Sequence, residues 1–180
     1  MSKAKKSQFG LTLLELLVAL VISSILVGVA VPSFKNIINS NRMRSKADLL
    51  KGALALARSE SAKRNLQVSL CKSSNLSSCD NSTDWDQGWI VFVDADADMV
   101  RDVGEPILQK FSALSTGYTI SASASFADSL AFLPTGALAA GGSVTDGFRI
   151  CGPDQNTANG RSIFVNAAGR PRITEGVTAC

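Results

Sequence analysis

One long apolar run near the N-terminus limits what this chain can fold into more than any other feature. From Leu11 to Val31 there are 21 residues, and Glu15 is the only charged one. A helix of that length rises about 30 Å, which is the thickness of the hydrocarbon core of a bilayer. We therefore expect a single membrane-spanning helix in this part of the chain.

The segment before the run is short, polar and basic. It carries Lys3, Lys5 and Lys6 and ends at Gly10. Lysines in this place hold the N-terminus on the cytoplasmic side of the inner membrane. An ordinary signal peptide has its small-residue cleavage site after the apolar stretch. Here the well-placed site precedes the stretch, so we expect cleavage after Gly10 and retention of the helix.

Glu15 needs an explanation of its own, because it lies inside the apolar run. A carboxylate there costs about 2.5–3.5 kcal/mol on insertion scales, and residues of this kind are usually functional. Cleavage after Gly10 creates an α-amino group four residues away, which can pair with the Glu15 of a neighbouring subunit. The alternative is a plain signal anchor with an isolated acidic residue. The rarity of such residues favours the functional interpretation.

The stretch GLTLLEL at residues 10–16 resembles the type III signal of type IV pilins and type II secretion pseudopilins. The resemblance implies cleavage by prepilin peptidase after Gly10, N-methylation of Leu11, and a filament core of packed helices in which Glu15 guides docking. The family's usual first mature residue is Phe, and here it is Leu. The implied location is the inner membrane before assembly and the pilus at the cell surface afterwards, with other pilins as partners.

Composition argues against catalysis. The chain has no histidine, which removes the commonest general base and metal ligand. It also has no Gly-x-Ser-x-Gly elbow, no P-loop and no cysteine spacing typical of a metal site. Of its 18 basic residues, three precede the proposed cut, which leaves 15 basic and 15 acidic residues in the mature chain. We expect neither enzyme activity nor a cofactor.

The chain divides by pattern into a leader at 1–10, a membrane and filament-core helix at 11–35, and a globular domain at 36–180. Pro32 removes a backbone donor, so we expect a bend there. An amphipathic helix is expected over 36–65, because apolar residues recur at steps of three and four. That apolar stripe consists of Met43, Ala47, Leu50, Leu54 and Ala57.

Short β-type segments separated by Gly, Asn, Asp and Ser fill residues 66–180, which indicates an antiparallel sheet domain. The predicted fold class is α+β and pilin-like, with a long N-terminal helix packed on antiparallel sheet. The predicted strands are Gln67–Cys71, Gly88–Asp94, Ile107–Phe111, Tyr118–Ser123, Leu130–Leu133, Phe148–Cys151 and Ser162–Asn166.

Four cysteines in a chain with an export-type N-terminus favour two disulfides. Three connectivities are open. The most natural one pairs Cys71 with Cys79 across a short loop and Cys151 with Cys180 near the C-terminus.

An acidic segment has the residue spacing of a calcium-binding loop. The acidic residues at spacing positions 1, 3, 5, 9 and 12 are Asp94, Asp96, Asp98, Asp102 and Glu105. Position 6, normally Gly, is Met99, and the flanking residues are typical of strands. A polar hairpin turn is therefore favoured over a calcium site, and no metal is expected. Residues 88–108 also resemble a stretch of the GspH/FimT branch of pilin-like proteins, in which it is structural.

The last candidate site is the stretch Gly169-Arg170-Pro171-Arg172. Pro171 pushes Arg170 into an extended conformation, so Arg170 and Arg172 should project to one side of a stiff, exposed loop. Paired guanidinium groups suit phosphate recognition, as in sequence-independent binding of nucleic acid. The alternatives are plain solvation or pairing with the acidic 73–109 region, and the residues alone favour solvation.

The same stretch resembles the C-terminal GRxR motif of the FimT minor pilins, which favours the DNA interpretation. The resemblance implies a minor pilin that binds double-stranded DNA through Gly169, Arg170 and Arg172 and supports uptake in natural transformation. Arg149 and Arg161 are further basic residues that would widen the patch. The alternative function is structural: a GspH-like pseudopilin of type II secretion, or a minor pilin that only primes assembly.

Overall fold

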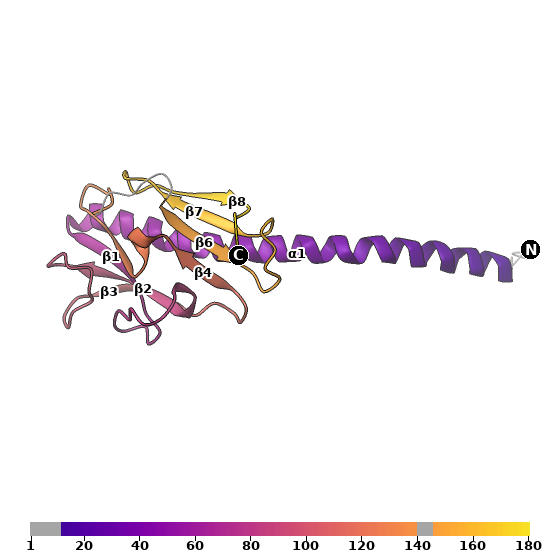
Figure 1. The fold of residues 1–180 in the computed structure, drawn as a ribbon, viewed down its shortest axis with the longest axis horizontal. Helices are drawn as coiled ribbons and strands as arrows, with labels where there is room; N and C mark the ends of the chain where they lie inside the picture. The colour runs from indigo at the N-terminus through magenta and orange to yellow at the C-terminus, as the bar shows by residue number, and fades with distance from the viewer. Residues whose placement is uncertain (1–11, 140–145) are drawn as a thin grey trace, which may run out of the picture. The chain divides into compact units, whose positions relative to one another are not determined.

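The structure is a computed structural model that describes residues 12–139 and 146–180. One long helix, α1 (Leu13–Arg64), precedes eight strands and two short 3-10 helices (Figure 1). The first four strands are β1 (Gln67–Lys72), β2 (Gly88–Asp94), β3 (Ile107–Ser112) and β4 (Thr119–Ala122). The others are β5 (Ser129–Phe132), β6 (Gly147–Cys151), β7 (Arg161–Val165) and β8 (Pro171–Glu175), and the 3-10 helices are η1 (Trp85–Gln87) and η2 (Ala124–Phe126).

By its internal contacts the chain forms two compact units, one ending at Ile38 and the other running from Asn39 to Cys180. Helix α1 contributes to both and is continuous in backbone through position 32, so the proline there does not end the helix. Within the ranges that the structure describes, no helix combines the length and the hydropathy needed to cross a membrane.

Two four-stranded antiparallel sheets make up the β part of the larger unit (Figure 1). The first sheet has the strand order β3-β2-β1-β5 and the second has β4-β6-β7-β8. The α+β class with antiparallel pairing, predicted from the sequence, is confirmed.

The core lies where the second half of α1 meets the inner faces of both sheets. The predicted stripe on α1 is buried there, with Leu50 and Leu54 completely inaccessible to solvent. The small side chains in the stripe let the helix approach the sheets closely. The sheet residues of this core are Val68, Leu70, Trp89, Val91, Leu130, Phe132, Ile120, Phe148, Ile150, Ile163 and Val165.

Two disulfides join segments outside this core. Cys71–Cys79 closes the loop after β1, and Cys151–Cys180 ties the end of the chain to β6. These are the two pairs favoured from the sequence. Cys71 also packs with Ile90 and Phe92 in a second, smaller cluster on the other face of the first sheet.

The segment after Gly169 is the main difference from the predicted elements. The sequence predicts that Arg170 and Arg172 share an exposed loop, but residues 171–175, which include Arg172, form β8, and this strand pairs with β7 from Arg161–Glu175 to Val165–Pro171. Strand β8 is an edge strand, and Pro171 is its first residue. Proline has no backbone N–H and cannot donate a hydrogen bond to a neighbouring strand. An edge strand tolerates this, because it has a neighbouring strand on one side only.

Leu49 and Leu50 provide a matched test of the core. Leu50→Ala should lower the free energy of unfolding by about 2–5 kcal/mol, because a buried cavity forms. Leu49 is 40% exposed, so Leu49→Ala should change it by no more than about 0.5 kcal/mol. Urea unfolding of the full chain in non-ionic detergent, followed by tryptophan fluorescence, measures both. Equal effects would contradict the described packing of α1.

Candidate nucleic-acid interface

At the N-terminus, Gly10 and Leu11 lie outside the described residues, and Glu15 lies in the first turn of α1. The backbone N–H of Glu15 donates to Thr12 Oγ1 at 3.2 Å. Thr12 is therefore the N-cap, and Glu15 holds the third position of a Thr-x-x-Glu capping box. This local role of Thr12 was missed from the sequence, although the spacing of the two residues signals it.

The predicted arginine motif is built on the tight turn between β7 and β8. Asn166 organises the turn: its carbonyl oxygen accepts from Gly169 N–H at 2.8 Å, and its Oδ1 accepts from Arg170 N–H at 2.9 Å. Gly169 has a φ of 71°, which is in the left-handed region that favours glycine. The turn is thus fixed by one backbone hydrogen bond and one hydrogen bond to the Asn166 side chain, without any contribution from the arginine side chains.

Gly169 is also needed because of what lies against it. A Cβ added at this position would collide with the carbonyl oxygen of Gly136 and come within 3.1 Å of the Phe132 ring. The same carbonyl oxygen accepts a hydrogen bond of 2.9 Å from Arg58 Nε on α1. A side chain of α1 therefore holds the segment on which the arginine turn rests.

The register of the second sheet brings several predicted residues onto one face. On one side of β7, Arg172 of β8 lies opposite Phe164. On the other side, Arg149 of β6 lies opposite Ser162, two residues before Phe164. Both arginines are exposed, whereas the residues that alternate with them face the core. Arg170 precedes Arg172 by two residues, lies in the turn before β8, and is also exposed.

This outer face is hollowed beside the arginines. The hollow has a volume of about 660 Å³, and none of the residues that line it is acidic. Five of the twelve lining residues carry a hydroxyl group, and the lining also includes one partly exposed aromatic ring, Phe164, and one guanidinium group, Arg149. The hydroxyl-bearing residues are Ser121, Ser123, Ser162, Thr174 and Thr178. The sequence analysis missed these residues, because only the strand register of the second sheet shows that they lie on the same face.

The C-terminal tail forms one wall of the hollow. Gly176, Val177 and Thr178 line it, and the Cys151–Cys180 disulfide fixes the end of the tail to β6. Arg149 Nη1 donates to the carbonyl oxygen of Ala179 at 3.3 Å. One edge of the Arg149 guanidinium group is therefore engaged by the tail.

The charges on this face are uncompensated. Among residues 12–139 and 146–180, no ion pair and no side-chain hydrogen bond involves Arg170 or Arg172. Glu175, the carboxylate nearest to them in sequence, is 3.5 Å from Arg161 instead. The two motif arginines remain available to an external anion.

Arg161 does not belong to the patch, which corrects the sequence-based expectation. Its side chain is almost fully buried. Its Nη2 donates to Ser40 Oγ on α1 at 2.9 Å, and its Nη1 donates to the carbonyl oxygens of Asn159 and Gly160. Arg161 therefore ties β7 to α1.

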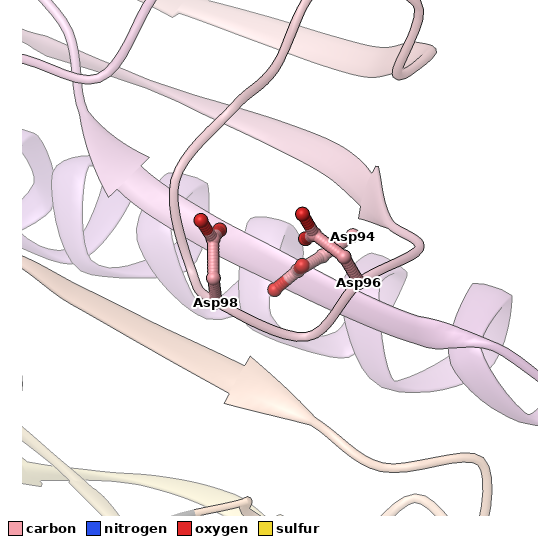
Figure 2. A group of neighbouring side chains, drawn as sticks. All are labelled: Asp94, Asp96 and Asp98. Atoms are coloured by element: carbon pink, nitrogen blue, oxygen red, sulfur yellow. The ribbon is translucent and has the colours of Figure 1, made fainter.

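The acidic segment forms the loop between β2 and β3, which is the antiparallel hairpin favoured from the sequence. The loop does not present the predicted calcium spacing as one ligand set. Glu105 instead accepts from the backbone N–H groups of Ala95 at 2.7 Å and Asp102 at 3.0 Å. Asp94, Asp96 and Asp98 do come together (Figure 2). Desolvation and the neighbouring Asp98 carboxylate raise the pKa of Asp96 above its ordinary value.

The fold and its N-terminal helix define a class, that of pilin-like filament subunits. Residues 46–169 match the family described as type II transport protein GspH, and residues 5–31 match the prokaryotic N-terminal methylation motif. The first match covers more than half of the chain, which therefore belongs to the GspH family, within the GspH/FimT branch of minor type IV pilins and pseudopilins. No curated protein matches the chain.

Two crystal structures of one minor pilin support the same fold. The type IV minor pilin FimU of Pseudomonas aeruginosa (strain PAO1) is 23% identical, with a TM-score of 0.60, and the match covers 78% of this chain and 96% of FimU. A second crystal form of FimU gives a TM-score of 0.57, with coverage of 76% and 98%. The minor pseudopilin EpsH of the Vibrio cholerae type 2 secretion system is 11% identical, with a TM-score of 0.46 and coverage of 74% and 96%.

Alanine substitutions at Gly169 and Gly176 distinguish the cost of a steric clash from the cost of backbone strain. Their φ angles are 71° and 76°, but a Cβ at Gly176 would find its nearest neighbour at 3.8 Å. Gly176→Ala should therefore lose only about 1–3 kcal/mol of stability, from strain. Gly169→Ala should lose more, because the Gly136 carbonyl must also move. Thermal unfolding of the two full-length variants compares them, and equal midpoints would contradict the described contact.

Proposed function

We propose that this chain is a minor pilin-like subunit that binds double-stranded DNA non-specifically through Arg170 and Arg172 and supports DNA uptake in natural transformation. One observation carries the proposal. Arg172 lies on the outer face of the second sheet, which also carries Arg149 and a hollow partly lined by hydroxyl-bearing residues, and Arg170 lies in the turn just before it. Within the described part of the chain, neither Arg170 nor Arg172 has an ion-pair partner.

The chemistry of this face suits a phosphate backbone. Guanidinium groups bind phosphate oxygens bidentately, and serine and threonine hydroxyls add neutral donors. Phe164 lies directly opposite Arg172 and supplies an apolar surface against which a sugar or an unpaired base can pack. None of these groups reads base identity, so we expect binding to be independent of sequence and sensitive to salt.

Binding to one subunit should be weak, with a Kd of about 10⁻⁴–10⁻⁶ M, as is usual for non-specific contacts. Several copies along one filament would strengthen it through avidity. Such a fibre could hold DNA firmly while each subunit exchanges rapidly.

The N-terminal part would build the subunit into the fibre. We infer a leader at 1–10 that prepilin peptidase removes, a helix at 11–35 that anchors in the inner membrane and then joins the filament core, and a globular domain at 36–180. Apolar side chains lie on every side of the first turns of α1, and such a helix is stable only when covered by lipid or other helices. Those at least half exposed are Leu13, Leu14, Leu16, Leu17, Val18, Leu20, Val21, Ile22, Ile25, Leu26 and Val27.

A structural role without DNA binding is the second candidate, and the match to the type II transport family favours it. In that case the subunit would be a pseudopilin of type II secretion or would prime assembly. Arg170 and Arg172 would then contact acidic side chains of neighbouring subunits.

DNA binding can be tested with the double variant Arg170→Ala/Arg172→Ala. The full chain in non-ionic detergent is titrated into fluorescent double-stranded DNA at several salt concentrations. Loss of two phosphate contacts should weaken binding at every salt concentration. It should also reduce the slope of log K against log salt by about 1.8.

Lys63→Ala/Arg64→Ala is the matched control. This variant also removes two positive charges, but from the end of α1, where both residues pair with Glu60. This variant should bind DNA as the unaltered chain does. Binding by the Arg170/Arg172 variant equal to that of the control would refute the DNA proposal and leave the structural role.

Processing is tested by mass spectrometry of the chain produced with prepilin peptidase. We expect a mature N-terminus at Leu11 that carries one added methyl group. Glu15→Gln should still be cleaved, but it should fail to enter filaments, because the partner of the new α-amino group has lost its charge. An N-terminus at any other residue would contradict the assignment of Gly10.

A further inference from the structure

Three carboxylates converge where β2 ends and its loop begins. Asp94 is the last residue of β2, and Asp96 and Asp98 follow it at alternate positions. One oxygen from each lies within 4.8 Å of the others. Figure 2 shows the three carboxylates grouped where β2 ends and its loop begins.

Asp94 is the unusual member of the group, because its side chain is completely buried. Its Oδ2 accepts three hydrogen bonds, from Gln67 Nε2 at 2.8 Å, Ser69 Oγ at 2.5 Å and Met99 N–H at 3.0 Å. Its Oδ1 has no hydrogen-bond partner anywhere in the described part of the chain. Buried carboxylate oxygens are normally satisfied, so this atom calls for a ligand.

No protein cation neutralises the group. Within the described ranges, none of the ion pairs includes any of the three aspartates. The basic residue of the loop, Arg101, points elsewhere and donates to the carbonyl oxygens of Glu105 and Ser77. Three adjacent negative charges therefore face one another with nothing positive between them.

The loop is held in this shape by groups that would not themselves touch an ion. Both Glu105 oxygens are taken by backbone N–H groups of the loop, and Arg101 N–H lies 3.4 Å from Cys79 Sγ in the disulfide-closed loop after β1. The three carboxylates are therefore held in place before any ion arrives.

We propose that Asp94, Asp96 and Asp98 bind one Ca²⁺ ion. All three ligands are hard oxygens, which suit Ca²⁺ or Mg²⁺ better than transition metals. Oxygens on opposite sides of Ca²⁺ lie about 4.6–5.2 Å apart, so a spread of up to 4.8 Å fits around this ion. Mg²⁺ is usually held by only one or two carboxylates and keeps several of its waters, so a group of three carboxylates favours Ca²⁺. Asp96 and Asp98 are exposed, which leaves room for water to complete the coordination.

The ion would give Asp94 Oδ1 its missing partner and would cross-link the end of β2 to the loop beyond it. Because that loop also contacts Cys79, both loops on this side of the first sheet would be stiffened. Sites of this open, water-completed kind have a Kd of about 10⁻⁴–10⁻³ M, which matches extracellular calcium.

The full chain in non-ionic detergent, freed of metal with EGTA, is titrated with CaCl₂ by calorimetry, and its thermal unfolding is recorded in Ca²⁺, Mg²⁺ and EGTA. We expect one Ca²⁺ per chain and a rise in the unfolding midpoint that grows with Ca²⁺ concentration and is smaller in Mg²⁺. No binding, or equal midpoints in Ca²⁺ and EGTA, would overturn the proposal.

Asp96→Asn and Asp98→Asn identify the ligands. Each should weaken Ca²⁺ binding at least tenfold. In EGTA each should unfold at the same temperature as the unaltered chain or higher, because repulsion is relieved. The unfolding temperature in EGTA thus distinguishes a variant that has lost a calcium ligand from one that has lost its fold. Asp84→Asn, which removes an exposed carboxylate elsewhere, should bind Ca²⁺ normally. Unchanged affinity in both loop variants would overturn the assignment.

Discussion

The contact between the apolar stripe of α1 and the inner faces of the two sheets is the interaction on which the rest of the molecule depends. Alanines in the stripe allow close approach, and Leu50 and Leu54 fill the space between the sheets. The same helix reaches the candidate DNA face through Arg58, which holds the Gly136 carbonyl against which Gly169 packs. The arginine turn is thus positioned from the core outward, and not by its own loop alone.

The fold was largely predictable because its signals are periodic. The helical stripe and all seven predicted strands follow from the spacing of apolar residues. Strand β8 was missed because Gly169 and Pro171 indicate a loop. Only its pairing with β7 makes this segment a strand. The candidate site was less predictable. The burial of Arg161 depends on its contact with Ser40, far away in sequence, and the position of Phe164 beside Arg172 depends on register. Glu105 has the sequence position of the last ligand in a calcium-binding loop, but its carboxylate accepts hydrogen bonds from backbone N–H groups of the loop instead.

The two candidate charged groups lie on different sheets. The aspartate group belongs to the first sheet, at the end of β2. The arginines of the candidate DNA face belong to the second sheet: Arg149 lies on β6, Arg172 on β8, and Arg170 just before β8. Holding opposite charges on different sheets keeps them from pairing within one subunit. Each group therefore remains open to an outside partner, which the proposals identify as a divalent cation for one and a polyanion for the other.

The disulfide between Cys151 and the terminal Cys180 links the shape of the arginine face to the compartment in which the chain resides. The tail that it anchors walls the hollow and holds Arg149 through Ala179. Such bonds do not persist in the reducing cytosol. A newly made subunit would therefore have an unfinished face while it is still near the cell's own chromosome. Under the proposed function, the face would be completed only after export, in an oxidising compartment.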